Sequence, residues 1–140
     1  MAFLRLIIIG ILLTSCHEEP NRVNRTDLIA GSDSFGKTWQ VSHIDIEIGT
    51  VTPFRCVTDN YITYFPNGKY EINEGSSKCD PNDPPAVSGV WFMNETQEQL
   101  IVELGDSIQM WRIESMESDS HEITSLFKEG SRTYTFISSR

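Results

Sequence analysis

The feature that most constrains the fold of this 140-residue chain is the spacing of its turn signals after Phe35. Short runs of β-branched and aromatic residues alternate with Gly, Pro, Asn and Asp about every 8–12 residues, the pattern of a domain built from strands. No segment has the helical periodicity of an amphipathic helix longer than about ten residues. The sequence predicts strands over residues 37–48, 60–65, 69–73, 87–93, 100–104, 108–116, 121–127 and 132–138.

Three turn signals join these strands into hairpins: Pro66-Asn67-Gly68, Gly105-Asp106 and Glu129-Gly130. Proline presets the φ of a turn, and Asn-Gly adopts left-handed φ readily. Consecutive hairpins close most economically into a barrel, so the predicted fold class is all-β, an eight-stranded antiparallel up-and-down barrel. A β-sandwich is the alternative. It usually needs a long crossing connection, and the long irregular stretch here is residues 74–86.

The first sixteen residues have the composition of a secretory signal: Arg5, the apolar run 6–13, and then Thr14-Ser15-Cys16. A spanning helix needs roughly 20 apolar residues, more than this run contains. The ending Leu13-Thr14-Ser15-Cys16 resembles the lipobox of bacterial lipoproteins, whose cysteine becomes the acylated first residue of the mature chain. The resemblance implies that residues 1–15 are removed. It also implies that Cys16 carries acyl chains such as palmitate and anchors the protein to a membrane of the bacterial cell envelope.

The residues after Cys16 predict a tether. The pair Glu18-Glu19 resembles the surface-export signal of Bacteroidota-type lipoproteins, and a merely solvated segment is an equally good interpretation. The expected location is the outer membrane, with the domain facing the periplasm or the cell surface. Residues 16–34 are polar and predict a flexible segment with one helical turn at Leu28-Ile29-Ala30. The folded domain is predicted over residues 35–140.

The chain has three cysteines, and acylation of Cys16 would leave Cys56 and Cys79 as a pair in an oxidising compartment. With a two-residue turn at Asn67-Gly68, these two cysteines would lie directly opposite each other on neighbouring strands. A three-residue loop that includes Pro66 would shift the register by one and leave them near neighbours. Either arrangement predicts a disulfide that closes the far end of the hairpin and stabilises the fold by roughly 3 kcal/mol.

Charge and motifs exclude several classes of function. Removing residues 1–15 removes one arginine, so the formal net charge falls from −9 to −10, which argues against nucleic acid as a partner. The histidines His17, His43 and His121 are isolated, and no nucleophile elbow or phosphate-binding loop occurs. The carboxylates of residues 74–83 lack the spacing of an EF-hand, which favours a solvated loop over a calcium site. We therefore predict no catalytic residue, no metal and no cofactor.

Several segments in a fixed order carry a family resemblance. They are 35–39 (FGKTW), 65–70 (FPNGKY), 89–91 (GVW), 111–116 (WRIESM), 126–127 (LF), 134–136 (YTF) and the cysteine pair. Together they resemble the small lipocalin-like domains of bacterial envelope lipoproteins, over roughly residues 35–140. One departure is that the lipocalin pattern is Gly-x-Trp, whereas here an extra residue separates Gly36 from Trp39. The resemblance implies a ligand-holding or structural barrel.

The aromatic residues are the candidates for a ligand site. An eight-stranded barrel is just wide enough to be filled by side chains or to hold one small ligand. Core packing is the alternative explanation, since aromatics supply large buried area in small β-domains. The expected inner-face ligand residues are Trp39, Trp91, Trp111 and Tyr134. The leading hypothesis is a membrane-tethered barrel that binds a small apolar molecule. The rival is a non-catalytic interaction module with a filled core that docks on an envelope protein.

Overall fold

The computed structural model describes residues 23–46, 49–51, 55–127 and 130–139 of the chain. Cys16 and the predicted signal lie outside the described residues. No described helix is both long and apolar enough to cross a bilayer. The elements are α1 (Arg25–Ala30), β1 (Lys37–Ile46), β2 (Gly49–Val51), α2 (Arg55–Thr58), β3 (Tyr61–Tyr64), β4 (Lys69–Asn73), β5 (Ala86–Met93), β6 (Gln99–Leu104), β7 (Ser107–Met116), β8 (Ser120–Phe127) and β9 (Gly130–Ser138).

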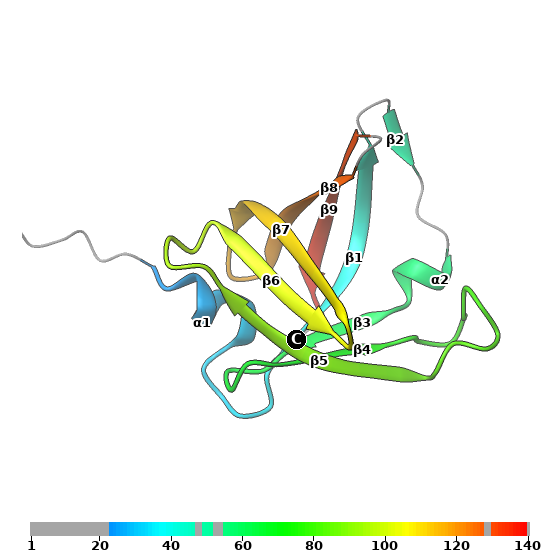
Figure 1. The fold of residues 1–140 in the computed structure, drawn as a ribbon, viewed down its shortest axis with the longest axis horizontal. Coiled ribbons are helices and arrows are strands. Elements are labelled where there is room, and N and C mark those ends of the chain that lie inside the picture. Colours follow the sequence, from blue (N-terminus) through cyan, green and yellow to red (C-terminus); the bar gives the residue numbers. More distant parts are fainter. Residues whose placement is uncertain (1–22, 47–48, 52–54, 128–129, 140) are drawn as a thin grey trace, which may run out of the picture.

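The strands form an antiparallel barrel that closes on itself (Figure 1). Neighbours follow the order β1-β3-β4-β5-β6-β7-β8-β9, and β9 returns to pair with β1 from Trp39↔Ser138 to Ile46↔Arg132. This confirms the predicted eight-stranded barrel over the sandwich. The short strand β2 is an addition that pairs with Ile44–Ile46 of β1. Of the predicted strand 37–48, the described part is β1, and residues 47–48 lie outside the described residues.

The β3–β4 hairpin has the three-residue loop that was one of the two predicted alternatives. Tyr64 pairs with Tyr70, and the Phe65 amide donates to the Lys69 carbonyl at 2.9 Å, which leaves residues 66–68 as the loop. The Gly68 amide closes the turn onto the Phe65 carbonyl at 3.0 Å, and Gly68 has φ +83°. A left-handed glycine after a tight turn is the usual way to close such a loop.

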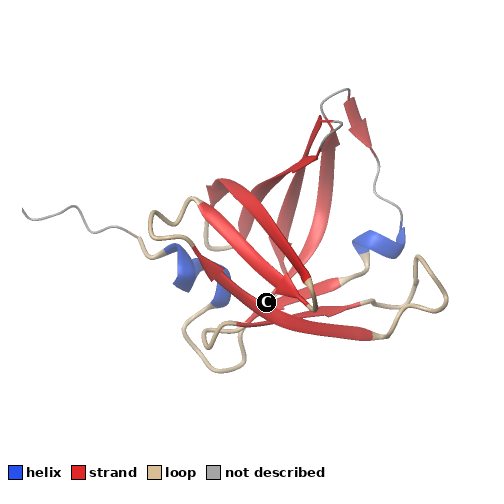
Figure 2. Cartoon of the chain, viewed as in Figure 1, coloured by secondary structure: helices blue, strands red, loops and turns tan. Residues whose placement is uncertain are grey.

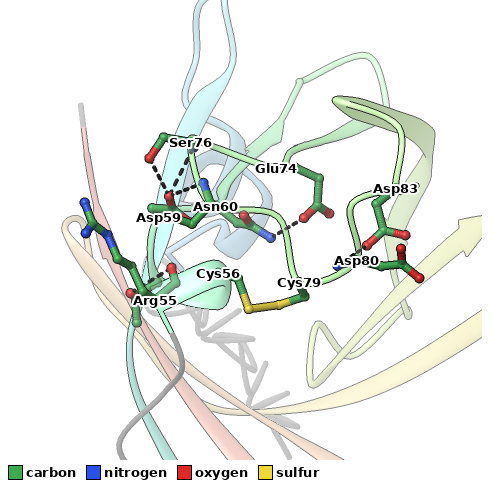
Figure 3. Close-up of a disulfide and its surroundings, with 11 residues drawn as sticks. Arg55, Cys56, Asp59, Asn60, Glu74, Ser76, Cys79, Asp80 and Asp83 are labelled. Atoms are coloured by element: carbon green, nitrogen blue, oxygen red, sulfur yellow. Dashed lines mark hydrogen bonds between the residues drawn. A yellow bond between two sulfur atoms is a disulfide. The ribbon is translucent and has the colours of Figure 1, made fainter.

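The predicted disulfide between Cys56 and Cys79 is present, with 5.0 Å between the two Cα atoms. Its predicted setting is wrong, since Cys56 lies on α2 and Cys79 lies in the loop after β4 (Figure 3). The strand pairing of β3 and β4 ends at Tyr61↔Asn73, so neither cysteine belongs to the ladder. The bond therefore ties a helical turn to a loop at one end of the barrel.

A carboxylate reinforces the same junction. Asp59 accepts hydrogen bonds from the Ser76 amide at 3.0 Å, the Ser76 hydroxyl at 2.9 Å and the Ser77 amide at 2.8 Å (Figure 3). These bonds lower the pKa of Asp59 although desolvation acts in the opposite direction. Asn60 adds a bond to Glu74 at 3.2 Å. The two sides of the irregular stretch are thus held together by polar contacts as well as by sulfur.

The helix α1 closes the other end of the barrel (Figure 2). Ile29 and Ala30 are fully buried, and the Trp39 indole Nε1 donates to the Ile29 carbonyl at 2.7 Å. The Asn24 side chain caps the helix by accepting from the Thr26 amide at 3.1 Å. The helical turn predicted within the tether, at Leu28-Ile29-Ala30, belongs to α1, and its Ile29 and Ala30 pack on the barrel core.

Candidate functional site

The inner face of the barrel holds all four predicted ligand residues. Side chains alternate between the two faces of a strand, and residues paired across strands share a face. By this register Trp39, Trp91, Trp111 and Tyr134 face inward, along with the buried Val102. The structure separates them into two pairs. Trp39 and Trp91 are buried, whereas Trp111 and Tyr134 are only half-buried.

The half of the barrel nearest α1 is filled by rings. Tyr64 contacts Tyr70 and Trp91, with ring centroids 5.2 and 5.5 Å apart. The Trp91 Nε1 donates to the Phe65 carbonyl at 3.0 Å. Burial raises the pKa of both tyrosines, Tyr64 and Tyr70. Trp39 and Trp91 are therefore packing residues of the core, as the alternative explanation of the aromatics held.

A histidine lies at the centre of this filled half. His121 is fully buried, stacks on Phe136 with 4.6 Å between centroids, and meets the edge of Trp39 at 4.4 Å. Neither ring nitrogen has a hydrogen-bond partner among the described residues. Burial, with a smaller contribution from the charge of Lys37, lowers the pKa of His121 to about 3. The imidazole is therefore neutral at physiological pH, and it packs in the core as an aromatic ring.

The opposite half of the barrel is split between β7 and β8. Their pairing begins at Trp111↔Ser125, so residues 107–110 of β7 pair with β6 but with no other described strand. Residues 126–127 of β8 likewise pair only with β9 among the described strands. The two strands therefore diverge toward the end of the barrel away from α1.

A cavity of about 630 Å³ occupies this split. Trp111 and Tyr134 form its inner wall with centroids 5.2 Å apart, and Ser125 and Gln109 add polar atoms from the inner face. Ile108 and Met110 lie on the rim, together with Gln99, Arg112 and Thr124. Cavities of 300–1,000 Å³ with aromatic walls and few polar groups are typical of small-molecule sites.

One donor in this wall is unused. The Trp111 Nε1 is buried and has no hydrogen-bond partner in the described part of the chain. A buried donor without a partner costs free energy, but this nitrogen exposes almost no surface, so it is not open to a molecule in the cavity. The guanidinium of Arg112 is already engaged, because its Nη2 lies 2.6 Å from the Glu114 carboxylate. The site therefore suits an uncharged, mostly apolar molecule whose polar contacts come from Ser125 and Gln109.

The site offers no reactive constellation within the described ranges. No group of three or more His, Cys, Asp or Glu side chains there could hold a metal ion. His43 lies 3.3 Å from Asp45 on the outer part of β1, away from the cavity. In the predicted solvated loop, Asp80 accepts from the Asn82 amide at 2.8 Å and from its side chain at 3.1 Å.

Sequence reasoning missed the rim and the polar inner residues. The alternation of residues 108–116 does place Gln109 on the same face as Trp111, so that signal was present. Ser125 follows from the β7–β8 register, which the sequence left open. The split itself has no sequence signal, because it depends on where two strands stop pairing.

Comparison with solved structures gives the same architecture. The fold is similar to the crystal structure, at 1.79 Å resolution, of a lipocalin-like protein from Bacteroides uniformis, with a TM-score of 0.50 and 10% sequence identity. The match covers 71% of this chain and 94% of that chain. No protein-family model matches the sequence. No curated protein matches it either. The chain is thus a lipocalin-like barrel by fold.

Proposed function

We propose that this protein is a lipid-anchored barrel of the bacterial cell envelope that binds a small apolar molecule in the cavity between β7 and β8. The observation that carries the binding proposal is the hollow of about 630 Å³ walled by Trp111 and Tyr134. Core packing explains the aromatic residues in the filled half of the barrel, but it does not explain those that line the cavity. A binding role also fits a lipocalin-like fold.

The proposed ligand is neutral or weakly polar. The aromatic wall supplies apolar contact, and Ser125 and Gln109 supply polar atoms. The formal net charge of the whole chain is −9, which disfavours anionic ligands at long range. The proposed membrane anchor is the acylated Cys16, supported by the lipobox-like residues 13–16. Two or more acyl chains would hold a protein stably, whereas one chain binds only marginally.

Titration with the neutral fluorescent probe N-phenyl-1-naphthylamine tests the cavity. We expect the probe to gain emission on binding and to quench tryptophan fluorescence. Ser125→Phe would place a ring on the inner face opposite Trp111, occupy the aromatic end of the cavity and abolish the probe signal. The matched control is Ser88→Phe, the same substitution at an exposed outward position of β5, and it should bind the probe as the wild type does. Equal binding by both variants would refute the proposed site.

The anchor is tested separately in cells. We expect the mature N-terminal peptide to carry acyl groups on Cys16 by mass spectrometry, and the protein to fractionate with membranes. Cys16→Ser should release it into the soluble fraction while leaving the barrel folded. An unmodified Cys16 in the native protein would refute the anchor without affecting the probe experiment.

A further inference from the structure

An apolar face lies on the outside of β5, β6 and β7. Cross-strand neighbours build it, since Phe92 pairs with Ile101 and Ile101 pairs with Met110. In the adjacent row, two further apolar residues flank Glu103. The exposed fractions of the two β7 residues are 65% and 66%. We call the following five residues the apolar face: Val90, Phe92, Ile101, Ile108 and Met110.

This grouping differs from ordinary surface hydrophobicity. The outward positions of an antiparallel sheet are usually polar, and single exposed apolar side chains are common. Here, however, neighbours on three adjacent strands are apolar together. Elsewhere the exposed large apolar residues of the described strands, such as Tyr61 and Ile137, lie on β3 and β9. Contiguous exposed apolar surface marks a place that contacts another apolar phase or a partner.

The start of the described chain is fastened beside this face. The Arg25 amide donates to the Gln97 side-chain oxygen at 2.9 Å, and the Arg25 guanidinium donates to the Gln97 carbonyl at 2.8 Å. The Gln97 amide group donates to Asn24 at 3.2 Å. Gln97 has φ +57°, a left-handed conformation that is uncommon for a residue with a side chain. These contacts hold the N-terminal segment against the β5–β6 loop.

The length of the preceding chain sets the reach of an anchor. Cys16 lies seven residues before Val23, and an extended chain of that length spans at most about 25 Å. The part of the apolar face nearest to the β5–β6 loop lies two residues from that loop, which is about 7 Å along the strand. An anchor at Cys16 would therefore keep a membrane within reach of the apolar face. It would also raise the effective concentration of the face at that membrane, so weak contacts would suffice.

The charges suit a zwitterionic lipid surface, whose choline cations can meet the Glu103 carboxylate between Val90 and Ile108. Lys69 is paired with Glu71 at 2.9 Å, and Arg112 is paired with Glu114 at 2.6 Å, so both flanking cations are neutralised. The chain as a whole is acidic, and anionic headgroups would repel it. We propose that the apolar face rests on a zwitterionic bilayer, a conclusion that relies on the anchor of the proposed function. Because Ile108 and Met110 also line the cavity, this orientation turns the cavity rim toward the lipid.

Quenching by brominated lipid tests the orientation. In the chain from Cys16 to Arg140, which retains every described residue, Cys16 is the only free thiol because Cys56 and Cys79 are bonded. This thiol is coupled to maleimide lipid in phosphatidylcholine vesicles with or without dibrominated phosphatidylcholine. Met110→Trp places a reporter in the face, and Ile137→Trp places the same reporter on the outside of β9. We expect brominated lipid to quench most of the fluorescence added by Met110→Trp and none of that added by Ile137→Trp.

Other outcomes would overturn the proposal. Equal quenching of the two reporters would mean that the apolar face has no preferred contact with lipid. If neither reporter is quenched and the uncoupled chain sediments as a dimer that Met110→Glu dissociates, the face is covered by a second copy instead. Chemical coupling supplies the anchor whether or not Cys16 is acylated in cells. A failure of this experiment is therefore separable from failure of the proposed lipidation or of the proposed cavity.

Discussion

Aromatic residues occur in both halves of the barrel, but they fill the interior in one half and line a cavity in the other. Near α1, Trp39, Tyr64 and Phe136 are buried and fill the interior. In the other half, Trp111 and Tyr134 are half-buried and wall a cavity. The filled half is bounded by a helix and by strands that pair on both sides apart from two register shifts, whereas the hollow half is bounded by strands that diverge. Whether an aromatic side chain packs in the core or lines a cavity therefore depends on whether the strands around it stay paired.

The sharpest test of this contrast compares two tryptophans. Trp39→Ala removes a fully buried side chain and its bond to the Ile29 carbonyl, so we expect a loss of about 3–5 kcal/mol in the free energy of unfolding. Trp111→Ala should cost only about 1–2 kcal/mol because its site is already open, but it should abolish probe binding. Denaturant unfolding and probe titration of both variants measure this. Equal destabilisation would remove the distinction between the halves.

The disulfide tests how the cavity end is held together. Cys79→Ala should lower the free energy of unfolding by roughly 3 kcal/mol, since a loop of this size is then free in the unfolded chain. Thermal unfolding of the variant measures the effect, with Cys56→Ala as the matched partner. The double variant should be no less stable than either single one. An unchanged melting temperature would show that the contacts of Asp59 suffice alone.

The packing of the filled half around the buried His121 can be tested by the pH dependence of the free energy of unfolding. Its pKa is lowered to about 3 in the folded protein from an ordinary 6.5, so the folded state disfavours the protonated form. The unfolded chain therefore binds this proton more readily than the folded protein does. The free energy of unfolding keeps its full value above pH 6.5 and falls by several kcal/mol in total as the pH drops toward 3. His121→Phe should remove this part of the pH dependence and raise stability at neutral pH by about 1–2 kcal/mol. Unfolding curves between pH 7 and 4 measure it, with the exposed His43→Gln as control. Loss of stability in His121→Phe at neutral pH would mean that the imidazole makes a bond the structure does not show.

The smallest expected effect concerns the fastening of the N-terminal segment. Gln97→Gly keeps the left-handed backbone favourable but removes the side-chain bonds to Asn24 and Arg25. Relief of strain and loss of hydrogen bonds then oppose each other, so stability should change by less than about 1 kcal/mol. Hydrogen exchange of α1 should nevertheless rise. Unchanged exchange would show that the packing of Ile29 alone holds the helix.

Strand positions could be predicted because alternation and turn residues act locally. The loop at residues 66–68 and the strand at 108–116 illustrate this, since proline, glycine and a period of two determine them within a few residues. The helices α1 and α2 are too short to show helical periodicity, so only the last turn of α1, at Leu28-Ile29-Ala30, was predicted and α2 was not. Both depend on partners distant in sequence: the barrel core for α1 and Cys79 for α2.

The sequence by itself determined the all-β class, the barrel, the pairing of Cys56 with Cys79 and the inward direction of the four aromatic residues. The strands follow from residue-by-residue alternation and turn residues, and the cysteine pair follows once Cys16 is assigned to the anchor. Only the tertiary structure decided where the interior is full and where it is hollow. Whether other side chains pack over Trp111 depends on where the pairing of β7 and β8 stops, and the closure of the whole barrel determines that point.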